Sequence, residues 1–230
     1  MRRRFRARTR WGLGRRIWLD PLSVIPLSRA LDEPGALFPG DPPFGLERVW
    51  TLEAGSSVNV SRIAHSDHAG THADLPYHLY SELAAWIIPQ THYVGAGYVL
   101  EAGQPVGPER IAEIPPEAAL LLVRTPRGGP ARKPVSDFPT LTPQAAERLL
   151  RLRIKTVVVD VLSVDVADSR ELPVHRILLE AGIGIVENAD LRPLRAGSLV
   201  WIEGAYVPVR HPQISALALA LRAYERWGWL

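Results

Sequence analysis

The chain has 230 residues, of which 47% are hydrophobic, and this is enough for one large core. It contains no cysteine, which excludes disulfides, thiolate metal ligands and cysteine nucleophiles. No run approaches the roughly 18 apolar residues of a membrane span, and no signal-peptide core follows the N-terminal arginines. We therefore expect one cytoplasmic domain at residues 17–230.

Residues 1–16 form a basic N-terminal extension. It holds eight arginines and no acidic residue, so the net charge of +3 for the whole chain becomes −5 for residues 17–230, with 19 basic against 24 acidic side chains. Such a tail can bind nucleic acid or an anionic surface. No known nucleic-acid motif accompanies it, however, so we expect a disordered extension and keep nucleic-acid binding as a disfavoured alternative.

Three histidines and one aspartate lie within eleven residues: His68, His72, Asp74 and His78. Imidazole nitrogen and carboxylate oxygen are ligands that suit zinc, manganese and iron. All four residues occupy even positions, so an extended backbone directs them to one side, whereas Gly70 and Pro76 disfavour a helix. A chance cluster of ordinary histidines is the alternative for any one of them, but the set predicts a metal site on extended or irregular backbone.

The rest of the chain alternates apolar strands with helices. Strands are expected at residues 97–101, 119–124, 155–160, 183–187 and 198–202. Helices are expected after the N-cap Thr142, at about residues 173–181, and at about residues 212–226. The Pro- and Gly-rich segment 125–139 predicts a surface loop. This order indicates an α/β domain with a mixed sheet.

The histidine-rich segment resembles a known family. His68-Ala-Gly-Thr-His-Ala-Asp-Leu-Pro-Tyr-His78 matches the H-x-G-T-H-x-D-x-P-x-H signature of the metal-dependent cyclase-like hydrolases, and most closely that of bacterial kynurenine formamidases, which are arylformamidases. The likeness continues upstream, in Phe38-Pro-Gly-Asp-Pro-Pro-Phe44 and in the run from Glu53 to Val60. It implies the swivelling β/β/α arrangement of that family and a homodimer or higher homo-oligomer.

The resemblance also implies two divalent metal ions per subunit, with zinc expected and manganese or iron as alternatives. One ion would be held by His68, His72 and Asp74. The second would be held by Asp74, His175 and Glu187, because the family's later histidine and glutamate are about twelve positions apart and His175 precedes Glu187 by twelve. A helix beginning near residue 173 and a strand ending near residue 187 would place both residues at element ends.

The reaction that the resemblance implies is hydrolysis of an aryl formamide, such as N-formyl-L-kynurenine, to kynurenine and formate in tryptophan catabolism. A divalent ion lowers the pKa of bound water from about 15.7 to about 7 and so supplies a hydroxide nucleophile. His78 would act as the general acid/base toward the leaving nitrogen. Phe38 would lie against the substrate ring, at a position where the family commonly has tryptophan.

Four alternatives remain from the sequence. Opening of a cyclic amide or lactone-like ring on the same ligands is the closest one. A purely structural metal site would need closed coordination, and a catalytically dead binding protein would normally lack a ligand or His78. A serine hydrolase is disfavoured because the chain has no G-x-S-x-G motif.

Overall fold

The computed structural model describes residues 4–5, 17–33, 37–83, 87–126, 140–206, 209 and 213–229. The predicted disordered extension at residues 1–16 lies outside these ranges, except for a short strand at Arg4–Phe5 that pairs with Ile17–Leu19. The predicted surface loop at residues 125–139 lies outside them from residue 127 onward.

Short strands and helices make up the described part of the chain. The strands are β1 (Arg4–Phe5), β2 (Ile17–Leu19), β3 (Val24–Pro26), β4 (Gly45–Trp50), β5 (Val60–Ala64), β6 (His72–Asp74), β7 (Val94–Glu101), β8 (Leu120–Arg124), β9 (Thr156–Val159), β10 (Gly184–Glu187), β11 (Leu199–Tyr206), β12 (Ala216–Tyr224) and β13 (Trp227–Trp229). The α-helices are α1 (Pro143–Leu149) and α2 (Pro173–Glu180), and the 3-10 helices are η1 (Pro21–Ser23), η2 (Leu52–Ala54), η3 (Pro76–His78), η4 (Ser81–Leu83), η5 (Gln90–Tyr93) and η6 (Arg110–Glu113). Among the described residues, no helix has the length and apolar character needed to cross a membrane.

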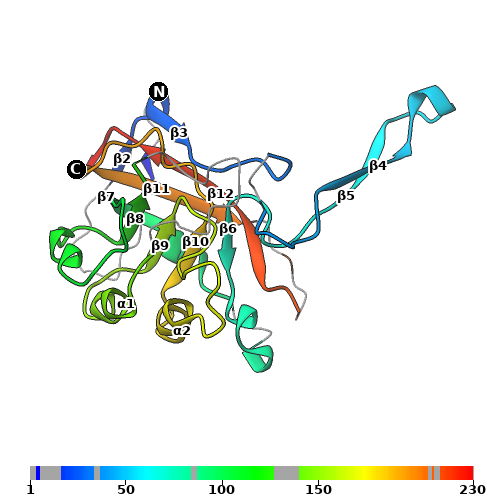
Figure 1. Cartoon of the computed structure of the whole chain (residues 1–230). Helices are drawn as coiled ribbons and strands as arrows, with labels where there is room; N and C mark the ends of the chain where they lie inside the picture. Colours follow the sequence, from blue (N-terminus) through cyan, green and yellow to red (C-terminus); the bar gives the residue numbers. More distant parts are fainter. Residues whose placement is uncertain are drawn as a thin grey trace.

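Eight strands form one mixed sheet in the order β11-β7-β8-β9-β10-β6-β12-β3. Strands β7, β8, β9 and β10 run parallel to one another. The other pairings of the sheet, β11–β7, β10–β6, β6–β12 and β12–β3, are antiparallel. Strand β11 also pairs with β12, so the sheet closes on itself. Helices α1 and α2 lie together on one side of it (Figure 1). This architecture confirms the predicted single α/β domain with a mixed sheet.

The central parallel strands are buried on both faces. On the outer face, which is covered by helices α1 and α2, lie Val157, Val159 and Ile185. On the inner face, within the closed sheet, lie Val158 and Val186. Covered faces on both sides account for the near-continuous apolar runs of these strands, since neither face meets water. The carboxyl ends of β9 and β10 are thereby held in fixed positions beside β6 and α2.

The helix predicted at about residues 212–226 is wrong, because Ala216–Tyr224 is strand β12. Alanine and leucine are strong helix formers, and that propensity favoured a helix. The side chains instead alternate with a period of two: Leu219 and Leu221 are buried inside the sheet, whereas Ala220 is exposed. Pairing with β11, β6 and β3 satisfies the backbone on both edges of β12 and overrides the local propensity.

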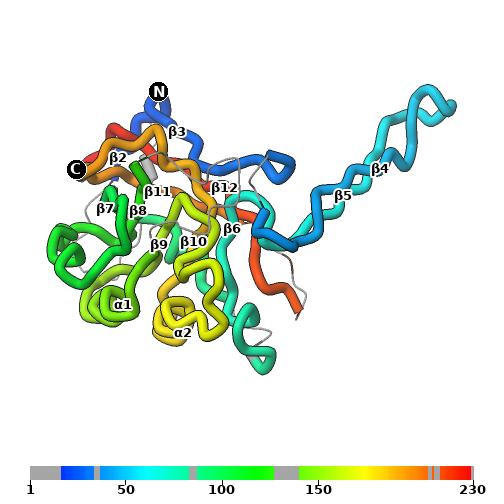
Figure 2. Tube along the Cα trace, in the orientation of Figure 1, coloured from blue at the N-terminus to red at the C-terminus, as the bar shows by residue number. Residues whose placement is uncertain are grey.

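Strands β4 and β5 form a separate two-stranded hairpin, which no sequence pattern led us to expect. It extends well away from the body of the protein (Figure 2). We call residues 45–64 the arm. Its two ends lead directly into the segment of Phe38 and Asp41 on one side and the histidine-rich segment on the other.

The alternating burial of β12 generates a stability prediction. Leu219→Ala should lower the free energy of unfolding by about 2–5 kcal/mol, because it removes a side chain that is only 3% exposed inside the sheet. Its exposed neighbour provides the control, since Ala220→Thr should change that free energy by no more than about 0.5 kcal/mol. Urea denaturation of the two variants measures both values, and equal losses would contradict the strand assignment.

Candidate metal centre

The histidine-rich segment folds as a tight turn, the strand β6 and the single 3-10 turn η3, in agreement with the extended or irregular backbone that was predicted. Gly70 has φ +65°, and an added Cβ would lie 3.2 Å from the carbonyl oxygen of Arg29, so the turn requires glycine. Strand β6 places His72 and Asp74 on the same face. His78 ends η3 and turns its ring toward that of His68, with 4.6 Å between the ring centroids.

His175 and Glu187 reach the same place from a distant part of the chain. His175 lies in the first turn of α2, and Glu187 is the last residue of β10. Strand β10 pairs antiparallel with β6, and this register sets Glu187 opposite His72. The pairing of two short strands therefore fixes the position of Glu187 relative to the candidate ligands of the histidine-rich segment.

The five residues form two groups that share Asp74. In the first group, His68 Nδ1 lies 3.2 Å from His72 Nε2 and 3.4 Å from Asp74 Oδ1. In the second group, His175 Nε2 lies 3.4 Å from Asp74 Oδ2 and 3.3 Å from Glu187 Oε1. Each oxygen of Asp74 thus faces a different group.

The donor set fits divalent metal ions. Asp74 has no exposed surface, and neither of its side-chain oxygens has a hydrogen-bond partner. A buried carboxylate is costly unless positive charge lies beside it, and a divalent cation held between Asp74 and the neighbouring imidazoles would supply that charge. Ligand atoms placed about 2.1 Å from a tetrahedral ion are roughly 3.4 Å from one another. The separations of 3.2–3.5 Å within the first group and 3.3–3.4 Å within the second match this value.

A carboxylate outside the two groups, Asp165, orients His175. It accepts a hydrogen bond of 2.7 Å from His175 Nδ1 and bonds of 3.0 Å from the backbone N–H groups of Val174 and His175. The N-cap position of α2 is Leu172, in the left-handed conformation and without a side-chain cap. Asp165 therefore caps the helix and points His175 Nε2 at Asp74, which is how outer partners commonly fix metal-binding histidines.

The other candidate ligands also have outer partners. His72 Nδ1 lies 3.0 Å from the carbonyl oxygen of Gly70, which leaves Nε2 directed at the two groups. His68 Nε2 contacts the hydroxyl of Ser215 at 3.0 Å, and that hydroxyl donates to Asp67 at 2.7 Å. No sequence pattern predicted Asp67, Asp165 or Ser215. Asp165 and Ser215 are remote from the motif in the chain, and no short-range spacing marks them.

Electrostatics at the site reflect its two buried carboxylates. Burial alone would raise the pKa of Asp74, but the surrounding imidazoles of His175, His68 and His72 hold it well below its usual range. Burial alone would lower the pKa of His72, but Asp74 and Glu187 raise it to about 10. His78 behaves differently, because burial lowers its pKa and keeps its imidazole neutral at pH 7. Without metal, protons on the histidines therefore supply the positive charge that the carboxylates demand.

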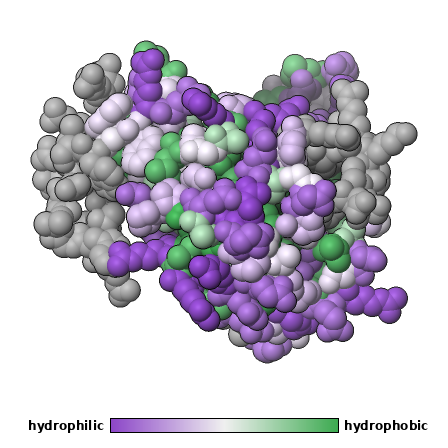
Figure 3. Space-filling view, turned by 60° about the vertical axis from the view of Figure 1, so that its left-hand side comes forward, coloured by the Kyte–Doolittle hydropathy of each residue, from purple (hydrophilic) through white to green (hydrophobic). Residues whose placement is uncertain are grey.

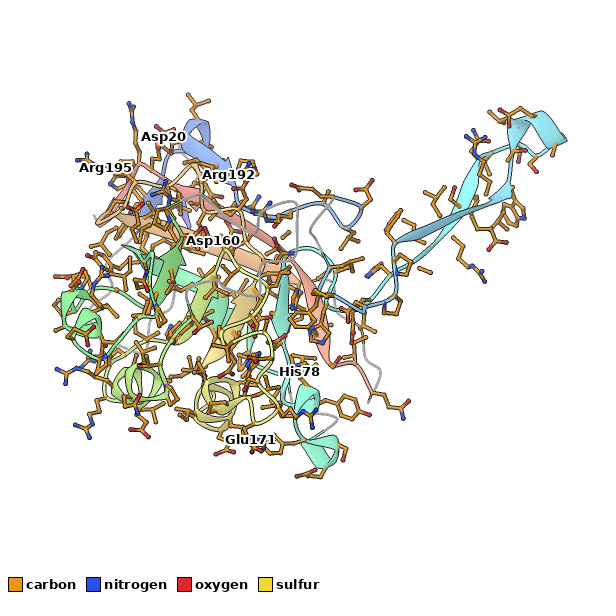
Figure 4. All side chains as sticks on the ribbon, viewed as in Figure 1. Asp20, His78, Asp160, Glu171, Arg192 and Arg195 are labelled. Carbon is orange, nitrogen blue, oxygen red and sulfur yellow. The ribbon has the colours of Figure 1, made fainter. Side chains whose placement is uncertain are left out.

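The site opens into a pocket of about 260 Å³. The histidines of both groups, Glu187 and His78, which is labelled in Figure 4, form one part of its lining. Phe38 and Asp41 line it from the chain segment before the arm, and Leu162, Val166 and Leu172 add apolar surface. The structure thus brings all the predicted site residues together. His211 lies outside the described residues, and His65 and His92 belong to neither group.

Comparison with known proteins agrees with this geometry. The model of the cyclase family matches residues 25–166. A kynurenine formamidase of Bacillus cytotoxicus is 33% identical over 184 residues, which are 78% of this chain and 85% of that protein. A kynurenine formamidase of Polaromonas naphthalenivorans is 34% identical over 184 residues, covering 76% of this chain and 80% of that protein.

Two solved structures share the fold. A predicted metal-dependent hydrolase from Bacillus stearothermophilus superimposes with a TM-score of 0.72 at 20% identity, over 88% of this chain and 98% of that chain. Isatin hydrolase A from Labrenzia aggregata gives a TM-score of 0.70 at 22% identity, over 87% of this chain and 92% of that chain. Together with the family match and the sequence relatives, they confirm the resemblance and show that the chain is a hydrolase of the cyclase family.

Proposed function

We propose that the protein is a metal-dependent amidohydrolase that cleaves an aryl formamide, such as N-formyl-L-kynurenine, to the arylamine and formate in tryptophan degradation. The observation that carries the proposal is the pair of ligand groups sharing Asp74, with His78 beside them on the wall of one pocket. The relatives named kynurenine formamidase, at 33–34% identity, support this substrate class. In the same proposal the enzyme is a cytoplasmic homodimer or higher homo-oligomer.

Each subunit would hold two divalent ions, zinc with manganese or iron as alternatives. One would be bound by His68, His72 and Asp74, and the other by Asp74, His175 and Glu187. When bound, such ions acidify a water molecule and polarise a carbonyl oxygen. The outer partners of the histidines keep the ligand atoms aimed inward, so little rearrangement is needed on binding.

His78 would move the proton of the reaction. Because burial keeps its imidazole neutral, it can accept a proton as water adds to the formyl carbon. The same imidazolium would then donate that proton to the nitrogen as the carbon–nitrogen bond breaks. The free arylamine leaves, the formic acid gives up its proton to solvent and leaves as formate, and His78 returns to its neutral form.

The pocket would select a small aromatic substrate. Its volume of about 260 Å³ is near the lower end of ligand sites, which span roughly 300–1,000 Å³, so it suits one aryl formamide group rather than a peptide segment. Phe38 offers an aromatic face to the substrate ring, and Leu162 and Val166 offer apolar contacts. Phenylalanine has no N–H group, so Phe38 would position the ring by packing alone.

The deciding experiment compares N-formyl-L-kynurenine with isatin, a cyclic amide, as substrates of the metal-loaded protein. Turnover of N-formyl-L-kynurenine with little opening of isatin would support the proposal. Preferential opening of isatin would replace it with the ring-opening alternative, and no turnover of either compound by protein with bound metal would refute the substrate class.

Substitution of His78 separates proton transfer from metal binding. His78→Ala should lower kcat by about 10²- to 10⁴-fold, because general acid–base catalysis typically contributes this much. Its metal content, measured by mass spectrometry of the same sample, should equal that of the wild type. A parallel loss of metal would instead identify His78 as a ligand.

Substitution of Asp74 tests the shared carboxylate. Asp74→Asn keeps the shape of the side chain but removes the charge that both groups share, so both ions should be lost together. Activity should fall by at least about 100-fold, because even the loss of an outer partner of a metal ligand can cost about that much. Asp20→Asn is the control, since Figure 4 labels Asp20 and His78 at opposite ends of the body. Loss of only one ion from Asp74→Asn would show that the residue does not bridge the groups.

Metal binding should release protons at neutral pH. Without metal, the nearby carboxylates raise the pKa of His72 to about 10 and that of His175 well above its usual value, so both are protonated at pH 7. These protons must leave before the nitrogens can bind an ion, and zinc affinity should therefore rise with pH. Calorimetric titration of metal-free protein with zinc, in two buffers of different ionisation enthalpy, measures the release. An enthalpy that is identical in both buffers would contradict it.

A further inference from the structure

The carboxylate of Asp41 lines the pocket but has no part in the proposed reaction. The candidate ligands and His78 form one part of the lining, where the amide would react. The other lining residues are apolar or carry a hydroxyl group, with Asp41 as the exception. No arginine or lysine lines the pocket among the residues that the structure describes. Asp41 is therefore a charge that remains to be assigned a role.

Asp41 and Phe38 belong to one tight turn. The backbone N–H of Asp41 donates to the carbonyl oxygen of Phe38 at 3.1 Å, and Pro39 and Gly40 lie between them. Gly40 has φ +101°, the sign that a type II turn requires at this position, and proline is common just before it. The first and last α-carbons of such a turn are less than about 7 Å apart. The turn thus presents an aromatic side chain and a carboxylate to the pocket together.

One oxygen of Asp41 fixes the position of the side chain. Oδ2 accepts a hydrogen bond of 3.0 Å from the hydroxyl of Ser66, and that hydroxyl accepts from the backbone N–H of His68 at 3.2 Å. Among the described residues, no donor bonds to Oδ1, and Asp41 belongs to neither group of candidate ligands. The half-buried carboxylate is therefore anchored on one side and available to a bound molecule on the other.

An available carboxylate favours a cation as its partner. In N-formyl-L-kynurenine, the ammonium of the amino-acid group lies at the end of a short acyl chain on the aromatic ring. A ring that packs on Phe38 would bring this ammonium to the other end of the same turn. The resulting hydrogen bond would be charge-assisted, and such bonds are about twice as strong as neutral ones. The carboxylate of the same amino-acid group finds no arginine or lysine in the described lining.

The dimensions of the pocket keep the ring and the ammonium close to this turn. At about 260 Å³, the pocket has room for one small molecule, so a ring and a cation cannot be bound far apart. On the face of the body drawn in Figure 3, apolar residues occur only as small patches among hydrophilic ones. An aromatic ring is covered better in the pocket, where Phe38, Leu162 and Val166 lie.

We propose that Asp41 is a specificity-determining residue, whose Oδ1 binds the ammonium of an aryl formamide that carries an amino-acid group. The inference rests on the proposed function for the aromatic ring of the substrate. It adds that the preferred substrate is an amino acid with a free ammonium and not a simple aryl formamide. The competing explanation is that Asp41 only anchors the turn through Ser66.

The test is calorimetric titration of the metal-loaded protein with two compounds. One is L-kynurenine, and the other is its deamino analogue, which keeps the ring, the ketone and the carboxylate but lacks the ammonium. The wild type should bind L-kynurenine about tenfold or more tightly, the effect of one hydrogen bond between charged groups. Asp41→Asn can still accept from Ser66 but has no charge, so this preference should fall below about threefold. Equal binding by the wild type, or a preference that persists in Asp41→Asn, would overturn the proposal.

Two further variants separate charge from anchoring. Asp168→Asn is the matched control, because Asp168 is exposed between two lining residues but does not itself line the pocket, and the preference should stay as in the wild type. Ser66→Ala removes the anchoring hydrogen bond and keeps the charge of Asp41, so it should reduce the preference less than Asp41→Asn does. A larger reduction in Ser66→Ala would show that anchoring is the only role of Asp41 and would refute the proposal.

Turnover distinguishes this inference from the reaction on which it rests. The ratio of kcat/KM for N-formyl-L-kynurenine and its deamino analogue should follow the binding preference in each variant. Turnover of both formamides at equal kcat/KM would overturn the role of Asp41 and leave the reaction standing. A binding preference that depends on Asp41, without turnover of either formamide, would support the ammonium site and refute the reaction.

Discussion

The structure of the site depends on one electrostatic constraint: two carboxylates, Asp74 and Glu187, are buried beside each other where strands β6 and β10 pair. Two negative charges in a water-poor interior are unfavourable unless positive charge lies between them. Three imidazoles surround Asp74, and they can meet this demand either as protonated groups or as neutral ligands that share a divalent ion. Proton and metal therefore compete for the same positions.

The fold supplies the rigidity that this arrangement needs. Strand β10, which ends at Glu187, is covered on both faces, and it pairs with β6, which ends at Asp74, so packing and strand pairing hold the two carboxylates near each other. Asp165 lies in the connection between β9 and α2 and uses one carboxylate to cap the helix and to orient His175. The same carboxylate therefore stabilises the start of α2 and sets the orientation of the His175 ring. This connects the second group of candidate ligands to the packing of α2 on the core.

The sequence predicted those features of the site that are local in the chain. His68, His72, Asp74 and His78 lie in one short segment whose spacing and residue types indicate metal binding, and the central apolar runs predicted the buried strands. His175 and Glu187 needed the family resemblance, because no local rule connects them to the motif. Asp165 contacts His175, ten positions away, and Ser215 contacts His68, 147 positions away. Only folding brings these residues together, so no local pattern predicts the contacts. Strand β12 was missed because helix propensity was given more weight than the period of its leucines. The arm was missed because no strand pattern was assigned to residues 45–64.

The position of His78 argues for catalysis over a structural role for this centre. A structural site closes its coordination with protein ligands, and the remaining histidine would then have no reason to lie within 5.5 Å of the His175 ring on the wall of a pocket. Burial keeps that imidazole neutral, whereas the neighbouring carboxylates favour protons on His72 and His175, so adjacent histidines hold different protonation states at one pH. Such a division between charge-bearing and proton-moving groups would serve the proposed hydrolysis of an aryl formamide, because its nitrogen leaves only when it is protonated.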